Sequence, residues 1–264
     1  MRTFNPAFSR QEAFAPREWG GIMADLQRSE TKARVSSTTM TVGGTTAKTG
    51  ILLGLAVICA AFSFNYAQTN PGVAMPMALG GGLGGFVLAL IIGFKPTASP
   101  FLAPIYAILE GLFLGVVSLV FAKQAGPQGA WMIGQAVAIT LGILAALLIA
   151  FSTGLVRLGT TATKVVVVAT MGVGLVYLAS FVMSLMGFGG IGFIHQGGPI
   201  GIGFSLLVIG LASLNLVLDF QFVEQGVQNQ APKYMEWYAG FGLLVTLVWL
   251  YIEVLRLLSK LREK

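Results

Sequence analysis

Residues 129–151 read GAWMIGQAVAITLGILAALLIAF and contain no charged side chain. A helix rises about 1.5 Å per residue, so roughly 20 apolar residues cross the ~30 Å hydrocarbon core of a bilayer. This segment is long enough to do so. Transmembrane β-strands would instead appear as segments of about ten residues with alternating hydrophobicity. The continuous apolar run therefore predicts a membrane-spanning helix.

Six further segments of the chain have the same character. Residues typical of turns separate them, among them Asn70-Pro71-Gly72 and Gly126-Pro127. The sequence therefore predicts an all-α polytopic membrane protein, with a polar segment at residues 1–48 and a seven-helix transmembrane domain at residues 49–264. The predicted spans are 49–66, 72–94, 100–122, 129–151, 163–187, 198–220 and 237–258.

Charged residues are scarce and unevenly placed. They make up 10% of the 264 residues, against roughly 25% in soluble domains. A water-facing surface cannot be built from so few. This composition excludes an intrinsically disordered chain and a nucleic-acid-binding protein, despite the net charge of +6. Between Thr49 and Phe220 the charged residues are Lys95, Glu110, Lys123, Arg157, Lys164 and Asp219.

Lysine and arginine near the span ends indicate the orientation, because cytoplasmic connections carry an excess of both. With the N-terminus inside, the outer connections hold only Lys123. We therefore expect residues 1–48 to form a mobile cytoplasmic tail, with no cleavable signal peptide. The inner connections then hold Lys95, Arg157, Lys164 and Lys233. Cations near the other end oppose this assignment and leave the side of the C-terminus open: Arg256, Lys260, Arg262 and Lys264.

Glycine-rich and reactive residues do not form the pattern of a catalytic site. The run at residues 80–85 lacks the Lys-Ser/Thr of a phosphate-binding loop. Its small residues four apart predict close helix packing in lipid, as do Gly172 and Gly174. His195 is expected to be a solvated loop residue, and Cys59 is the only cysteine. We expect no enzymatic activity and no cofactor.

Acidic residues inside the spans are the candidate functional residues. A charge at the bilayer centre costs ~3 kcal/mol on insertion scales, and such residues face a bundle interior or a water path. Glu110 lies near the middle of the third span, and Asp219 ends the sixth. Glu253 lies in the last third of the seventh, one turn before Arg256, so a structural ion pair is an alternative for it. Two acids that approach each other share a proton, which would suit a proton-sensitive gate.

Three segments resemble the Bax inhibitor-1/YccA family, also called transmembrane Bax inhibitor motif proteins. Residues 106–115, YAILEGLFLG, are similar to its aromatic–Leu–Glu–Gly–x–x–Leu–Gly signature. Leu218-Asp219-Phe220 and residues 250–258, LYIEVLRLL, resemble the end of its sixth span and its closing helix. The beginning, residues 5–10, resembles a bacterial branch with a long N-terminal tail.

The resemblance implies a seven-helix bundle with the last helix at its centre, in a bacterial inner membrane. It also implies a pH-dependent cation leak, chiefly of calcium, closed by an acid pair between spans six and seven. Asp219 takes the first position of that pair. Two registers compete for the second, which falls on Glu253 by one and on Thr246 by the other.

Helix geometry separates the two registers. Counted from the start of span seven, Glu253 lies roughly 24 Å along the axis and Thr246 about 14 Å. Asp219 lies near the same membrane surface as that start, so direct contact with Glu253 is not expected. Thr246 can hydrogen-bond a carboxylate but cannot share a titrating proton with it. The two residues lie two turns apart on one helix face.

The resemblance, together with the acids inside the spans, thus implies a passive, pH-sensitive cation pathway lined or gated by Asp219, Glu110, Thr246 and Glu253. Calcium is the favoured ion, protons being the gating alternative. Calcium would bind transiently at Asp219 and Glu110, because a tight site needs six to eight oxygens. The alternative function is a non-conducting regulatory partner of a membrane quality-control protease or a stress response. Residues 1–48 would then be the segment that binds the partner. A proton-coupled transporter is less favoured, because no inverted repeat with broken helices is seen.

Overall fold

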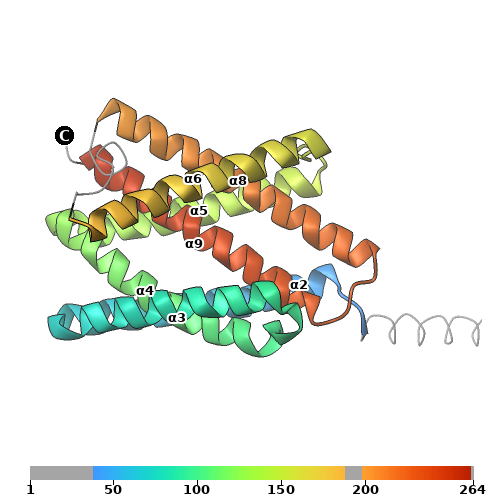
Figure 1. The fold of residues 1–264 in the computed structure, drawn as a ribbon, viewed down its shortest axis with the longest axis horizontal. Helices are drawn as coiled ribbons and strands as arrows, with labels where there is room; N and C mark the ends of the chain where they lie inside the picture. The colour runs from blue at the N-terminus through green and yellow to red at the C-terminus, as the bar shows by residue number, and fades with distance from the viewer. Residues whose placement is uncertain (1–37, 188–197, 263–264) are drawn as a thin grey trace, which may run out of the picture. The chain divides into compact units, whose positions relative to one another are not determined.

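A computed structural model describes residues 38–187 and 198–262, and the part from Met40 onward forms one unit. Seven of its helices are long and apolar enough to cross a membrane (Figure 1). The predicted all-α fold with seven transmembrane helices is confirmed. In chain order the helices are α2 (Val42–Thr69), α3 (Ala74–Phe94), α4 (Ser99–Gln124), α5 (Gly129–Ser152), α6 (Thr160–Leu185), α8 (Pro199–Gln228) and α9 (Met235–Arg262).

Polar residues extend several helices beyond the predicted apolar spans. Helix α2 begins at Val42, before the predicted boundary at residue 48, because Thr41 caps it by accepting a hydrogen bond from Gly44 N over 3.0 Å. Helix α8 continues to Gln228 past the predicted end at residue 220. Hydropathy marks the part of a helix that suits lipid, whereas backbone hydrogen bonding continues into the polar flanks.

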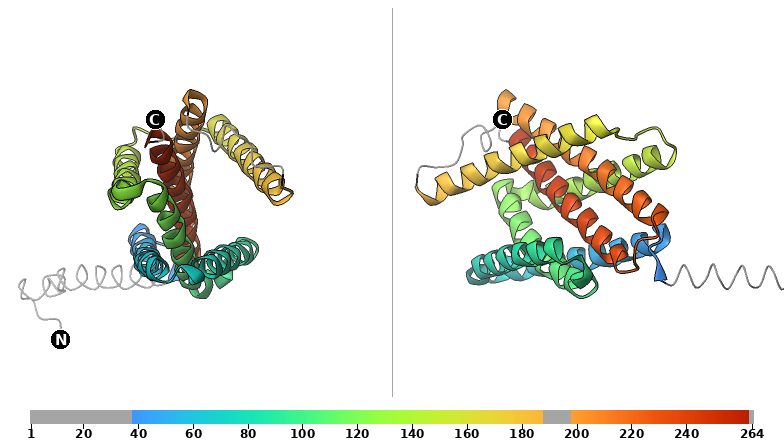
Figure 2. Two further views of the ribbon diagram at one scale, coloured as in Figure 1. Left: turned by 90° about the vertical axis from the view of Figure 1, so that its left-hand side faces the viewer. Right: turned by 45° about the vertical axis from the view of Figure 1, so that its right-hand side comes forward.

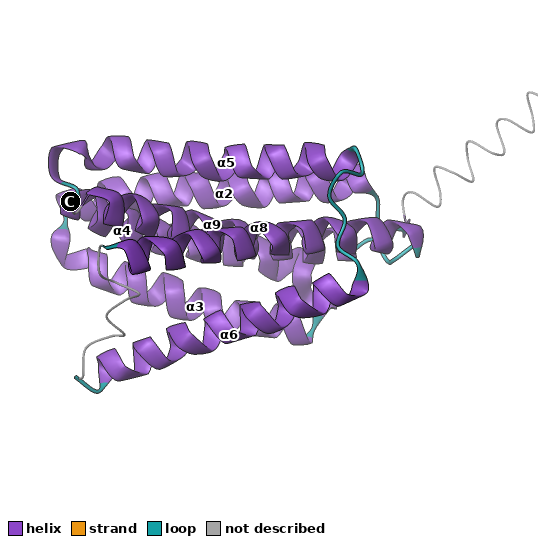
Figure 3. Cartoon of the chain, turned by 90° about the horizontal axis from the view of Figure 1, so that it is seen from above, coloured by secondary structure: helices purple, strands orange, loops and turns teal. Residues whose placement is uncertain are grey.

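Short turns that begin with or contain proline join the first four helices. Each is a single 3₁₀ turn: Pro71–Val73, Pro96–Ala98 and Gly126–Gln128. Proline suits the first turn of a helix, where its missing N–H has no partner to lose. The connection between α5 and α6, residues 153–159, is longer (Figure 3). Gln221 Nε2 of α8 donates to Leu158 O in this connection over 3.0 Å.

Helix α9 lies at the centre, as the resemblance implies. It packs against α2, α4, α5 and α8, and Figure 2 shows it running between the other helices. Helices α3 and α6 are more peripheral, since α3 packs mainly on α4 and α6 on α8.

Two faces of α9 contribute to two different apolar cores. Leu243, Leu247 and Leu250 pack with residues of α5 and α8. Phe241, Leu244 and Val248 pack with α2 and α4. On each face of α9 the apolar residues recur at spacings of three and four. Almost the whole circumference of the helix is therefore used for packing. A residue on this helix has few ways to reach lipid, and its polar residues must find partners among the surrounding helices.

The predicted close packing is confirmed for glycines of the 80–85 run and is wrong for Gly172 and Gly174. Gly81 and Gly85 face α4, where a Cβ atom on Gly81 would lie 2.6 Å from Leu109 O. The positions of Gly172 and Gly174 are open, with nothing within 4 Å of a Cβ atom, because α6 packs loosely on its neighbours. His195 and residues 1–37 lie outside the described residues. A cytoplasmic N-terminus stays a prediction.

Candidate functional site

Asp219 lies in the contact between α8 and α9, beside the apolar residues Leu216 and Phe220 of its own helix. Its Oδ2 atom is buried and has no hydrogen-bond partner among the residues that the structure describes. Leaving a buried acceptor unsatisfied is costly, and more so for a charged group. The described structure thus contains, inside an apolar helix contact, a carboxyl oxygen whose hydrogen-bonding capacity is unused.

Thr246 of α9 is a side-chain hydrogen-bond partner of the Asp219 carboxyl group. The Thr246 hydroxyl also donates to Gly242 O, one turn earlier on its own helix, over 3.2 Å. A hydroxyl carries one hydrogen, so at any moment Thr246 can donate either to the Asp219 carboxyl group or to its own backbone. Of the two registers that the sequence left open, the structure has Thr246, and not Glu253, opposite Asp219.

Glu253 takes part in a different cluster, between α9 and α6. Tyr177 Oη donates to Glu253 Oε1 over 2.7 Å, and Arg256 Nη1 donates to the same oxygen over 2.7 Å. Arg256 also donates to the Tyr177 hydroxyl and lies over its ring, 4.9 Å from the ring centre. The Glu253–Arg256 ion pair is therefore present, with Tyr177 as a third member. In the described part of the chain, Glu253 Oε2 is buried without a hydrogen-bond partner.

Glu110 occupies a third place, where α4 meets α3. It is buried, and the Tyr106 hydroxyl, one turn earlier, interacts with its carboxyl group. A Cβ atom on Gly85 would lie 3.0 Å from Glu110 Oε2, so the glycine makes room for the carboxylate. The Tyr106 ring packs edge-on against Phe241 of α9, 4.9 Å between centres. The four predicted residues are thus distributed over three helix contacts.

An apolar cavity of about 390 Å³ lies between α2, α4, α5 and α9. Its wall includes Ser118 and Tyr251, whose hydroxyl groups lie 2.7 Å apart. None of the four predicted residues lines this cavity. This cavity and the four predicted residues are therefore separate features of the described structure.

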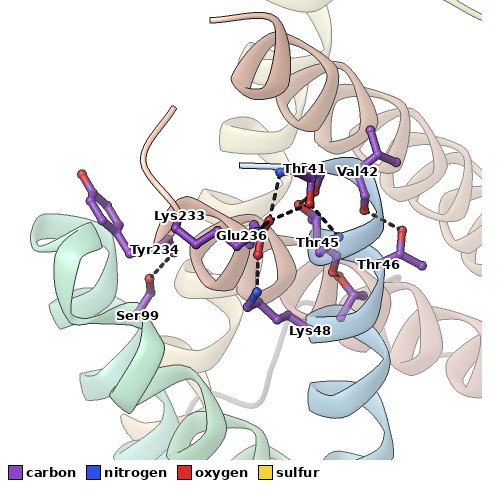
Figure 4. Close-up of polar contacts among 11 residues, drawn as sticks. Thr41, Val42, Thr45, Thr46, Lys48, Ser99, Lys233, Tyr234 and Glu236 are labelled. Carbon is purple, nitrogen blue, oxygen red and sulfur yellow. Dashed lines mark hydrogen bonds and ion pairs between the residues drawn. The ribbon is translucent and has the colours of Figure 1, made fainter. Parts of the chain in front are cut away.

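Sequence reasoning missed Glu236, in the first turn of α9. This carboxylate is fully buried and accepts hydrogen bonds from Thr41 N and Thr41 Oγ1, both over 2.9 Å (Figure 4). Lys233 Nζ lies 2.8 Å from it, and Lys48 Nζ makes a second ion pair. The cluster joins the beginning of α2 to the beginning of α9. Its only sequence signal was a pair of cations near predicted span ends.

Lys260 was also missed as a buried group. Its ammonium donates to Gly201 O over 2.9 Å and to Ser205 Oγ over 3.0 Å, and the residue is 2% exposed. It joins the end of α9 to the beginning of α8. Sequence analysis counted Lys260 among the terminal cations. A lysine just after a predicted span has the same sequence signal whether it is buried or solvated, because its burial depends on the neighbouring helix.

Comparison with known proteins identifies one family. The chain matches the family model described as Bax inhibitor 1 like over residues 5–263, nearly its whole length. No curated protein and no solved structure matches it.

Proposed function

The chain belongs to the Bax inhibitor 1 like family of multi-pass membrane proteins, and on that premise we propose that it is a passive cation leak pathway gated at Asp219. Calcium is the proposed ion and a bacterial inner membrane the proposed location. The observation that carries the proposal is the buried Asp219 Oδ2 atom, which lacks a hydrogen-bond partner between two membrane-spanning helices.

An acid held in this way is suited to a passing cation. Acids inside membrane-spanning segments mark ion pathways because the cost of burying them has to be balanced by function. Glu253 is paired with Arg256 and Glu236 with Lys48, so cationic side chains of the protein neutralise both carboxylates. Asp219 has the Thr246 hydroxyl beside it instead, and its charge is open to an ion in transit.

Few oxygens surround Asp219, which favours conduction over storage. Calcium binds tightly when six to eight oxygens coordinate it. One carboxyl group and one hydroxyl supply fewer than that. Binding would be brief, and Glu110 would be a second transient position in another helix contact.

The proposed pathway is closed in this conformation. Leu216 and Phe220, one turn before and one residue after Asp219, pack with Leu243 and Leu247 of α9. Opening therefore requires α8 to move relative to α9.

Calcium entry into proteoliposomes at acidic, neutral and mildly alkaline pH tests the proposal. Asp219→Asn and Thr246→Val are compared with the wild type, and Glu224→Gln is the matched control. Glu224 lies on the same helix but pairs with Arg157 over 2.9 Å at a partly exposed position. Altered flux in Asp219→Asn and wild-type flux in Glu224→Gln are expected. No flux in folded wild-type protein would contradict the leak and favour the non-conducting regulator.

A further inference from the structure

A second polar site lies between α6 and α9, away from Asp219 and Thr246. It is a pocket of about 400 Å³. Three residues of α6 and four of α9 line it: Tyr177, Ser180, Ser184, Trp249, Ile252, Glu253 and Arg256. Glu253 is 1% exposed, whereas Ser184 is exposed. The pocket thus leads from an exposed serine towards a buried carboxylate.

The hydrogen bonding of Glu253 is incomplete. Both donors of the cluster, Tyr177 Oη and Arg256 Nη1, are directed at Oε1. Oε2 is buried and has no hydrogen-bond partner within residues 38–187 and 198–262, although each carboxylate oxygen can accept two hydrogen bonds. The terminal torsion of a glutamate side chain is soft, so the carboxylate can turn towards a donor that enters the pocket.

The charges in the pocket restrict what that donor is. The Arg256 guanidinium lies against the same carboxylate, and it repels a divalent cation twice as strongly as a singly charged one at the same distance. Calcium would also need more oxygens than this pocket offers. A singly charged group that brings N–H donors suits the remaining Oε2 atom and the Ser184 hydroxyl. The Trp249 side chain adds an aromatic wall, which attracts an ammonium group and the methylene groups attached to it.

We propose that this pocket binds a protonated primary amine, with its ammonium group on Glu253. The amine has two possible sources, a free small molecule or the headgroup of an ethanolamine phospholipid. The proposal does not rest on the cation leak, because neither Asp219 nor Thr246 lines the pocket.

Calorimetric titration of the full chain in phosphatidylcholine nanodiscs with ethylamine hydrochloride tests it. Saturable binding is expected, weakened about tenfold or more in Glu253→Gln, which loses the charge-assisted hydrogen bond. Glu253→Gln also loosens the cluster, so Ser184→Leu is a second variant that blocks the exposed end of the pocket and leaves the cluster intact. Glu224→Gln is the matched control and should bind as the wild type does.

Repeating the titration in nanodiscs that contain phosphatidylethanolamine identifies the source. Weaker ethylamine binding there means that the headgroup already occupies the pocket, and equal binding means that a free amine is the ligand. Tetramethylammonium, which has the charge but no N–H, should bind at least tenfold more weakly than ethylamine. The proposal is overturned if the folded wild type shows no saturable binding, or if Glu253→Gln and Ser184→Leu both bind as tightly as the wild type.

Discussion

Gly115 of α4 lies directly against Ser63 of α2, so closely that a Cβ atom on the glycine would overlap Ser63 Oγ. Ser63 is fully buried and donates to Ala60 O over 3.2 Å. One turn earlier, a Cβ atom on Gly111 would lie 2.5 Å from Ala56 O. The two glycines of the YAILEGLFLG segment therefore let the backbones of α2 and α4 approach, as small residues four apart do in membranes.

Gly115→Ala is expected to destabilise the protein, because the added methyl group meets backbone atoms that cannot move away. Overpacking of this kind costs about 1–3 kcal/mol. Unfolding in detergent, followed by circular dichroism, would show a lower midpoint. Gly142→Ala on α5 is the matched control, since nothing lies within 4 Å of its added Cβ atom. A Gly115→Ala midpoint equal to that of Gly142→Ala would contradict the close contact.

Glu236→Gln is expected to loosen the junction between α2 and α9. The substitution keeps the shape but removes the charge that Lys48 and Lys233 neutralise. We expect a loss of about 1–3 kcal/mol in the free energy of unfolding, at the lower end because Lys233 is 39% exposed and solvent screens its charge. Glu224→Gln breaks a surface pair instead, and should cost at most about 1 kcal/mol. Equal midpoints for the two variants would show that the buried cluster contributes no more to stability than the surface pair does.

Tyr177→Phe is expected to weaken the α6–α9 contact while preserving its ring. The variant removes the donor to Glu253 Oε1 and the acceptor for Arg256 Nη1. Losing one buried partner costs about 1–3 kcal/mol. Thermal unfolding in detergent measures the effect, and amide hydrogen exchange in residues 160–185 should rise. Tyr66→Phe, at an exposed tyrosine, controls for loss of a hydroxyl alone, and the same shift in both variants would argue against the cluster.

The fold could be predicted from the sequence because hydropathy and the length of each apolar run depend on local composition alone. Where helices continue into polar residues, composition no longer marks the end. Thr41 at the beginning of α2 and Gln228 at the end of α8 illustrate this. The central position of α9 came from the family resemblance, since no pattern in residues 235–262 states how many neighbours that helix has.

The candidate site could be predicted only in part. Counting residues along α9 indicated that Thr246 lies closer in depth to Asp219 than Glu253 does, and in the structure Thr246 interacts with Asp219 whereas Glu253 interacts with Tyr177. The partners of Glu253 depend on the rotation of α6, which places Tyr177 beside it. The Glu236 cluster joins residues 195 positions apart in the sequence, and no local pattern carries such information.

Thr246→Asp is expected to give the leak a steeper pH dependence. The variant places a second carboxyl group opposite Asp219, and two carboxyl groups in contact titrate as a coupled pair that shares a proton. The wild type has one carboxyl group at this contact and should respond less sharply. Calcium entry into proteoliposomes over a series of pH values measures the difference. Thr246→Asn, of the same size and without charge, is the control. If Thr246→Asp and Thr246→Asn give the same pH profile, residue 246 does not act on the gate.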